Sequence, residues 1–239
     1  MPAKSDTKTA VVTGASRGMG LAIAEGLAKA GFNVVFTARN SGELTSAAKR
    51  VEKHGTRVLV ERCDVRDAKS VQHLFAAVKR EFGCVNVLVN NAGYAGPLKN
   101  IDELSIEAWQ ETIETNLTGT FLCTHAALPL MARGSTIVNN LSVAAKGYFP
   151  GMAAYVAAKH GVMGFTLTLR EEVRAKGIRV MGLMPGATDT DIWKQFWPDA
   201  PRSRMISPES VASVVVNAIL LPENATVEEV VIAPTAGAL

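Results

Sequence analysis

The chain has 239 residues, 48% of them hydrophobic and 20% charged, with a formal net charge of +3 and a pI near 8.8. This composition excludes a disordered chain and allows a soluble α/β fold with one substantial core. Lys and Arg are dispersed rather than clustered, and the three cysteines and four histidines lack metal-ligand spacing, so we expect no nucleic-acid partner and no metal site.

We expect neither a secretory signal at the amino terminus nor a membrane-spanning segment. Residues 1–9 are polar, and the longest later apolar run, at 211–221, is interrupted by Ser213 and Asn217 and is too short to cross a bilayer. The expected location is therefore cytoplasmic.

Valine-rich apolar runs recur along the chain and are typical of strands buried on both faces of a parallel sheet. They lie at 10–13, 34–38, 57–60, 85–89, 136–139, 178–183 and 230–233. Segments with helical spacing separate them, and a glycine closes nearly every segment, namely Gly31, Gly55, Gly83, Gly134 and Gly177. Ser207, Pro208 and Glu209 mark another helix start.

This alternation predicts a single Rossmann-type doubly wound α/β domain over residues 1–239. It should contain a seven-stranded parallel sheet with helices on both faces. The ligand is expected at the carboxyl ends of the strands.

A glycine-rich turn, TGASRGMG at 13–20, joins the first predicted strand to a helix beginning near Gly18. Glycines allow close approach to a pyrophosphate, and the helix amino terminus attracts anions. The spacing G-x-x-x-G-x-G differs from the general G-x-G-x-x-G, so an ordinary tight turn is the alternative. The predicted cofactor contacts here are Gly14, Ser16, Arg17, Gly18, Met19 and Gly20.

Arg39 ends the second predicted strand, where an NAD-binding protein often places an acidic residue. A guanidinium can hold a phosphate through two charged hydrogen bonds, and Arg17 is a second candidate for this contact. The pattern favours NADP(H) over NAD(H). The alternative is two solvated surface arginines.

Ser142, Tyr155 and Lys159, together with the glycine turn, resemble the short-chain dehydrogenase/reductase family, whose hallmark is Y-x-x-x-K with a serine about a dozen residues upstream. The motif NNAG at 90–93, the pair Asp64 and Val65, and Pro185-Gly186 with Thr190 follow in the expected order. The resemblance runs from about Thr9 to Thr190. Within the family, the chain is similar to the 3-oxoacyl reductases.

Residues four apart share a helix face, so Tyr155 and Lys159 can both face one cleft. An ammonium close to a phenol favours the phenolate, so we expect Lys159 to lower the pKa of Tyr155. The resemblance implies that Tyr155 is the general acid/base, that Ser142 binds the same substrate oxygen, and that Lys159 also binds the nicotinamide ribose. It implies that Asn116 holds a water in a proton relay.

Each of these residues also has a purely structural alternative. Ser142 could satisfy backbone groups at a strand end, Tyr155 could pack in the core while Lys159 reaches solvent, and Asn116 could be a helix-kink or cap residue. The joint spacing beside the glycine turn favours the catalytic interpretation.

The resemblance extends to further cofactor contacts and includes one departure. It implies that Asp64 and Val65 lie near the adenine. It implies that Asn91, Ala92 and Gly93 lie along the adenosine, and that Pro185, Gly186, Thr188 and Thr190 lie around the carboxamide. The departure is Asn140-Leu141 before Ser142, where family members often carry a small or hydroxyl residue.

The substrate side is predicted from aromatic residues. Trp193, Phe196 and Trp197 fall at about 190–206, where the resemblance implies a substrate lid, and Tyr148, Phe149 and Met152 form a second apolar cluster. These clusters predict an apolar pocket for a ketone or 3-oxoacyl thioester, although the first could instead be a buried helix face or a subunit contact. Arg202 and Arg204 are candidates for meeting an acidic carrier, or are simply exposed.

The activity that the resemblance implies is an NADP(H)-dependent interconversion of a carbonyl and a secondary alcohol. A non-catalytic NADP(H)-binding sensor or interaction protein with the same fold is the alternative, and an epimerase or dehydratase would need a larger carboxyl-terminal part. The resemblance also implies a homotetramer, built through the helices around Trp109 and Tyr155 and through the last strand, with a homodimer as the alternative.

Overall fold

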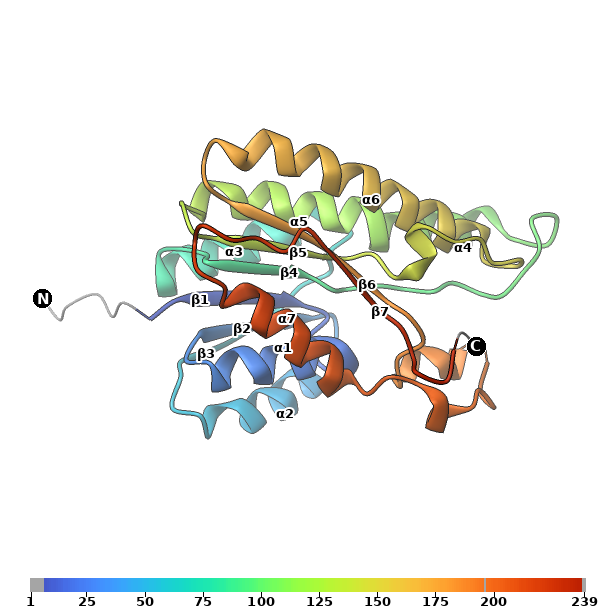
Figure 1. Ribbon diagram of the computed structural model, residues 1–239, viewed down its shortest axis with the longest axis horizontal. Helices are drawn as coiled ribbons and strands as arrows, with labels where there is room; N and C mark the ends of the chain where they lie inside the picture. The colour runs from blue at the N-terminus through green and yellow to red at the C-terminus, as the bar shows by residue number, and fades with distance from the viewer. Residues whose placement is uncertain (1–6, 196, 238–239) are drawn as a thin grey trace, which may run out of the picture.

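The computed structural model, which describes residues 7–195 and 197–237, is organised around a twisted parallel sheet (Figure 1). The strand order is β3-β2-β1-β4-β5-β6-β7. Strands β2 and β3 are added on one side of β1, and β4 to β7 are added on its other side. The strands are β1 (Thr9–Thr13), β2 (Asn33–Ala38), β3 (Val58–Arg62), β4 (Val87–Asn90), β5 (Thr136–Asn140), β6 (Arg179–Pro185) and β7 (Glu229–Ile232). The predicted seven-stranded, doubly wound α/β fold is confirmed.

The central strands are apolar because both of their faces are covered. Every residue of β1, β4 and β5 is buried, whereas β7 at the sheet edge alternates between exposed and half-buried residues. The predicted strand at 85–89 begins later, at Val87, because the N–H of Val85 bonds to the carbonyl of Leu130 in a loop. The strand predicted at 57–60 continues to Arg62.

Two layers of helices cover the sheet (Figure 1). One face carries α1 (Gly18–Lys29), α2 (Ser41–Glu52) and α7 (Pro208–Ile219). The other carries α3 (Ala68–Phe82), α4 (Ile106–Ile113), α5 (Gly119–Ala127) and α6 (Ala153–Arg174), and a π-helical turn, η1 (Glu114–Thr118), joins α4 to α5. Among the described residues, no helix combines the length and the apolarity needed to cross a membrane.

Local signals end and begin the helices as predicted. Gly83 closes α3 in the left-handed conformation, with φ of 80°, where a Cβ would be strained. Ser207 caps α7 by accepting a hydrogen bond from the N–H of Ser210, with Pro208 in the first turn. Because the strands are parallel, the loops that follow β1, β2, β3 and β4 lie together at the carboxyl ends of the strands.

Candidate active site

The glycine turn forms a backbone cradle at the carboxyl end of β1. Gly14 and Gly18 have φ of 63° and 54°, and a Cβ added to Gly20 would lie 2.3 Å from the carbonyl oxygen of Gly14. In the described part of the chain no side chain caps the start of α1, so its first N–H groups can serve an anion. The turn therefore has the shape and the polarity of a pyrophosphate site.

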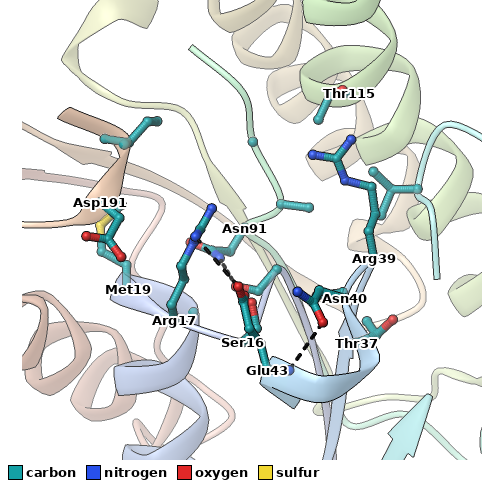
Figure 2. Close-up of a pocket in the computed structure, with 18 of the residues that line it drawn as sticks. Ser16, Arg17, Met19, Thr37, Arg39, Asn40, Glu43, Asn91, Thr115 and Asp191 are labelled. Carbon is teal, nitrogen blue, oxygen red and sulfur yellow. Dashed lines mark hydrogen bonds and ion pairs between the residues drawn. The ribbon is translucent and has the colours of Figure 1, made fainter. Parts of the chain in front are cut away.

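A cavity of about 350 Å³ opens over this turn, along the loops that follow the first four strands (Figure 2). Most of the cofactor contacts predicted from the sequence line it. They are Gly14, Ser16, Arg17, Gly18, Met19, Gly20, Arg39, Asp64, Val65, Asn91, Ala92, Gly93 and Thr190. The structure thus brings segments from residue 14 to residue 190 to one place.

The cavity also has lining residues that the sequence analysis did not identify: Thr37, Ala38, Asn40, Glu43, Cys63, Thr115, Asp191 and Ile192. Two of them had a readable signal, because Asn40 followed three residues later by Glu43 is the pattern of a helix N-cap. Asn40 indeed caps α2 by accepting hydrogen bonds from the N–H groups of Gly42 and Glu43. Thr115 had no such signal; its buried hydroxyl has no hydrogen-bond partner in the described structure.

Arg17 and Arg39 both line the cavity (Figure 2), and each side chain lies near an acid. The guanidinium of Arg17 lies 4.0 Å from a carboxylate oxygen of Glu43, and that of Arg39 lies 3.8 Å from one of Glu111. Both arginine side chains are more than half exposed, at 58% and 56%, so these ion pairs are weak. The guanidinium groups can therefore turn towards a bound anion.

Asp64 is held by a neighbour that the sequence analysis did not single out. The guanidinium of Arg66 lies 2.7 Å from the Asp64 carboxylate and also reaches Glu111 at 2.9 Å. Hydrogen bonding to Arg66 lowers the pKa of Asp64, against the smaller effect of partial burial. Asp64 is consequently an ionised hydrogen-bond acceptor at the cavity wall.

Tyr155 and Lys159 lie on one face of α6, as their spacing predicts. The Lys159 Nζ atom is 5.4 Å from the centre of the Tyr155 ring and donates a hydrogen bond of 2.7 Å to the carbonyl of Asn140 at the end of β5. Lys159 is buried, with 5% of its surface exposed, and this desolvation lowers its pKa to about 8.

The prediction that Lys159 lowers the pKa of Tyr155 was wrong for the protein by itself. Burial raises the pKa of Tyr155, and hydrogen bonding from the Ser142 side chain opposes this rise only in part. The physical reason is that removing the phenol from water disfavours its charged form, while the nearby ammonium is itself desolvated. Tyr155 therefore keeps its proton at neutral pH.

Ser142 occupies an unusual backbone conformation just after β5. Its φ of 69° and ψ of 159° fall in a region that residues with a Cβ rarely adopt. Leu183 O accepts hydrogen bonds from the N–H groups of Leu141 and Ser142, and Ser142 Oγ accepts one from Ala144. Strain of this kind is typical of functional sites, and here it turns the hydroxyl towards Tyr155.

Asn116 lies in the π-helical turn η1 and is almost fully buried, at 1% exposure. Its Nδ2 donates to the carbonyl of Tyr94 at 2.7 Å and to that of Thr112 at 2.8 Å. The turn widens the helix, and the Asn116 side chain ties it to the loop after β4, where a Cβ on Gly93 would lie 3.1 Å from its Oδ1. The helix-kink interpretation of Asn116 is therefore correct as a description of the backbone, and it leaves a catalytic role open.

The residues assigned to the carboxamide end lie at the end of β6, and only Thr190 lines the cavity. Gly186 pairs with Ile232, and the Thr188 hydroxyl donates to Gly186 O. Pro185 ends β6 opposite Ile232. The structure therefore places Pro185, Gly186 and Thr188 beside the cavity and not in its wall.

The segment after Thr190 begins as a short helix, η4 (Asp191–Gln195). The ring of Trp193, on this helix, meets that of Trp197 edge-on, with their centroids 6.1 Å apart. Phe196, the third aromatic residue of the predicted cluster, lies outside the described residues. Arg202, in η5 (Arg202–Arg204), donates to Thr190 O at 2.8 Å and pairs with Asp189, while Arg204 donates to Ala236 O. Both arginines thus hold this segment to the body of the protein.

Comparisons with known proteins agree with this site. The chain matches the family model described as short chain dehydrogenase over residues 8–201, a range that includes every predicted site residue. The chain belongs to the short-chain dehydrogenase family. It is an oxidoreductase, and enzymes of this family act on small-molecule carbonyl or alcohol substrates.

Similar proteins support the assignment of this short-chain dehydrogenase over most of its length. A putative ketoacyl reductase of Streptomyces coelicolor is 37% identical over 236 residues, covering 89% of this chain and 90% of the relative. A 3beta-hydroxysteroid dehydrogenase of Mediterraneibacter gnavus is 38% identical over 195 residues, covering 81% and 71%. The crystal structure of an alcohol dehydrogenase from Thermococcus sibiricus, complexed with 5-hydroxy-NADP, has a TM-score of 0.89 at 32% identity and covers 97% of this chain and 98% of its own.

Proposed function

We propose that the protein is an NADP(H)-dependent reductase or dehydrogenase that interconverts a ketone and a secondary alcohol, with Tyr155 as general acid and base. The observation that carries this proposal is the placement of the buried Lys159 ammonium 5.4 Å from the Tyr155 ring, on a helix that packs against the strand end beside the glycine turn. A solvated lysine and a core tyrosine would not need this arrangement. The neighbouring Ser142 hydroxyl supplies a second hydrogen-bonding group at the phenol.

The cavity fits a nicotinamide dinucleotide. Its glycine turn leaves room for a pyrophosphate, because a Cβ at Gly20 would collide with the turn, and Thr115 lines the same cavity. Asp64, Val65, Asn91, Ala92 and Gly93 would hold the adenosine half, and Pro185, Gly186, Thr188 and Thr190 would border the carboxamide. When bound, the cofactor supplies or accepts the hydride.

The protein's own groups manage the proton and the position of the substrate oxygen. During reduction, Tyr155 would donate its proton to that oxygen while Ser142 hydrogen-bonds to it. Lys159 would bind the ribose hydroxyls and supply positive charge next to the phenol, and Asn116 would hold a water for proton exchange. The high pKa of Tyr155 favours this donor role, since the phenol is protonated at neutral pH.

We also infer a preference for NADP(H) over NAD(H). Arg17 and Arg39 both line the cavity, and their acidic partners lie 3.8 to 4.0 Å away in exposed surroundings. A doubly charged phosphate can displace such weak partners, whereas a neutral ribose hydroxyl cannot. The complex of the Thermococcus sibiricus enzyme with 5-hydroxy-NADP is consistent with this preference.

The substrate is inferred to be an apolar ketone or 3-oxoacyl compound bound in a single domain under a lid at about 190–206. Large apolar side chains are exposed on the loops near the site, including Leu98, Tyr148, Phe149 and Trp197. The lid arginines Arg202 and Arg204 are both engaged in internal hydrogen bonds, which weakens the case for an acidic carrier at this segment. The names of the relatives, a ketoacyl reductase and a hydroxysteroid dehydrogenase, fit an apolar carbonyl substrate.

The test of this function is the loss of NADPH absorbance with a panel of cyclic ketones, aromatic ketones and 3-oxoacyl thioesters. We expect turnover with at least one apolar ketone, and product analysis should show the secondary alcohol. A protein that binds NADPH tightly but turns over none of the panel would instead be the non-catalytic sensor. Failure to bind either NADPH or NADH would overturn both interpretations.

We further propose that the protein forms a homotetramer, or at least a homodimer, through the surface of α4, α5 and α6. Ile106, Trp109, Phe121 and Leu167 are exposed there, and the Phe121 ring stacks edge-on against Phe165 at 6.3 Å. Val231 on β7 is 61% exposed and marks a second apolar surface at the sheet edge. Clustered apolar side chains of this kind are typical of protein interfaces.

For this assembly we expect Phe121→Glu to reduce the mass measured by light scattering to that of a smaller oligomer or monomer, because a buried unpaired charge opposes association. The matched control is Leu220→Glu, which places the same charge at an exposed apolar residue after α7 and should leave the mass unchanged. A monomeric wild-type protein would contradict the proposal.

A further inference from the structure

Asn140 lies at the end of β5, between the glycine turn and the buried lysine, and contacts both. Its Nδ2 donates a hydrogen bond of 3.1 Å to Oδ1 of Asn91, and its main-chain carbonyl accepts one of 2.7 Å from Nζ of Lys159. Only 9% of Asn140 is exposed. A polar side chain buried to this degree is stabilised by such partners, so its two contacts fix its position.

On one side, Asn140 holds the amide that supports the glycine turn. Asn91 Nδ2 donates to the carbonyls of Thr13 at 3.0 Å and Gly14 at 3.3 Å. A Cβ placed on Gly20 would lie 2.5 Å from the same Nδ2, so the amide is packed directly against the turn. The Asn140 donor fixes the orientation of this amide, because Oδ1 of Asn91 must then face Asn140 and Nδ2 must face the turn.

On the other side, Asn140 holds the Lys159 ammonium. The acceptor is a neutral carbonyl, so Lys159 receives a hydrogen bond without a compensating negative charge, and burial lowers its pKa to about 8. Of the described titratable groups, the phenol of Tyr155 on the same helix is the one with a direct contact to it. From β5 the lysine meets the neutral main-chain carbonyl of Asn140.

We propose that Asn140 is a positioning residue that couples the seat of the cofactor pyrophosphate to Lys159. Hydrogen bonds join Gly14 to the Asn91 side chain and Asn91 to the Asn140 side chain, and the main-chain carbonyl of Asn140 accepts the bond from Lys159. The side-chain amide serves the glycine turn, and the carbonyl of the same residue serves the ammonium. The inference rests on the proposed function, because both ends belong to the cofactor site and the proton-transfer group assigned there.

The first test separates the side-chain role from the carbonyl. Asn140→Leu keeps the size and the main-chain carbonyl but removes the donor, which leaves Asn91 Oδ1 buried without its partner and frees the amide to turn. We expect the Kd for NADPH, measured by fluorescence titration, to rise about tenfold, as for the loss of one buried hydrogen bond.

The matched control for this test is Asn86→Leu. Asn86 also bridges two strands through its side chain, with Oδ1 accepting from the N–H of Thr9 at 2.8 Å, but it lies at the amino ends of β4 and β1, far along the strands from the glycine turn. The Kd of the Asn86→Leu variant for NADPH should remain that of the wild type. An unchanged Kd in Asn140→Leu, or an equal rise in Asn86→Leu, overturns the proposal.

The second test uses a readout that a purely structural role would not move. Asn140→Asp places a carboxylate on the residue whose main-chain carbonyl holds Lys159, and an opposite charge nearby favours the ammonium and raises its pKa. Oxidation of the alcohol needs the Lys159 ammonium close to the phenolate, so the basic limb of the kcat/KM profile for oxidation should move upward by about one pH unit. Asn86→Asp, with the same change of charge, should leave the limb in place.

The two levels of the proposal fail in different ways. If wild-type protein binds no nicotinamide cofactor, the proposed function fails and this inference fails with it. If the wild type binds and reduces ketones, but the basic limb in Asn140→Asp does not move or moves equally in Asn86→Asp, the proposed function stands and the coupling through Asn140 is rejected.

Discussion

Tyr155→Phe is expected to lower kcat for ketone reduction by about 10³-fold, the contribution typical of a positioned general acid. The substitution removes only the phenolic hydroxyl. The ring that packs 5.4 Å from Lys159 remains, so α6 and the cavity keep their shape. The Kd for NADPH should therefore stay close to the wild-type value while turnover collapses, which steady-state kinetics and fluorescence titration measure separately.

Tyr148→Phe is the matched control for this change. It removes the same hydroxyl from a tyrosine in the adjoining loop whose surface is 89% exposed, but it keeps the apolar ring, so kcat should not change. If Tyr155→Phe retained more than roughly a tenth of wild-type kcat, another group or water would be the proton donor, since general acids contribute far more than this. Loss of NADPH binding in Tyr155→Phe would instead indicate that the phenol serves the structure of the site.

The pKa shifts of Tyr155 and Lys159 favour carbonyl reduction over alcohol oxidation. Burial raises the pKa of Tyr155, so its proton is present at neutral pH and available to a developing alkoxide. Oxidation of an alcohol requires the phenolate, which must be stabilised by positive charge close to the ring. Lys159 can provide that charge only below its pKa of about 8, and an oxidised nicotinamide would add to it.

The fold could be predicted because its signals are local. Valine runs buried on both faces identify strands, and the glycine that ends α3 must adopt a positive φ of 80°, which needs no knowledge of the rest of the chain. The strand predicted to start at Val85 was placed too early because its N–H bonds to Leu130, a partner 45 residues away. Such a contact cannot be read from a window of sequence.

The site was predictable where spacing alone fixes geometry, as for Tyr155 and Lys159 on one helix. It was not predictable where packing decides. The sign of the Tyr155 pKa shift depends on how much of the phenol is desolvated. Arg66 forms ion pairs with both Asp64 and Glu111, and these depend on how α4 lies against the loop after β3. The π-helical turn at Asn116 has no signature in its sequence.

Arg39→Asp is expected to raise the KM for NADPH by about 10²-fold, the equivalent of losing a charged pair of hydrogen bonds. The new carboxylate would repel a 2′-phosphate, and Glu111, now 3.8 Å from the Arg39 guanidinium, would remain close by and add to the repulsion. The KM for NADH should stay the same or fall, because an acid at the end of the second strand can accept a hydrogen bond from the ribose 2′-hydroxyl. Initial rates measured over a range of each cofactor, at one fixed ketone concentration, give the ratio of the two KM values.

Arg80→Asp controls for the change in net charge, since Arg80 is exposed on α3 and outside the cavity lining. It should leave both KM values unchanged. Equal losses for NADPH and NADH in Arg39→Asp would show that Arg39 does not contact a 2′-phosphate. If the NADPH preference then proved sensitive to Arg17→Ala instead, the phosphate would lie on the Glu43 side of the cavity, where the Arg17 guanidinium is 4.0 Å from that acid and free to turn.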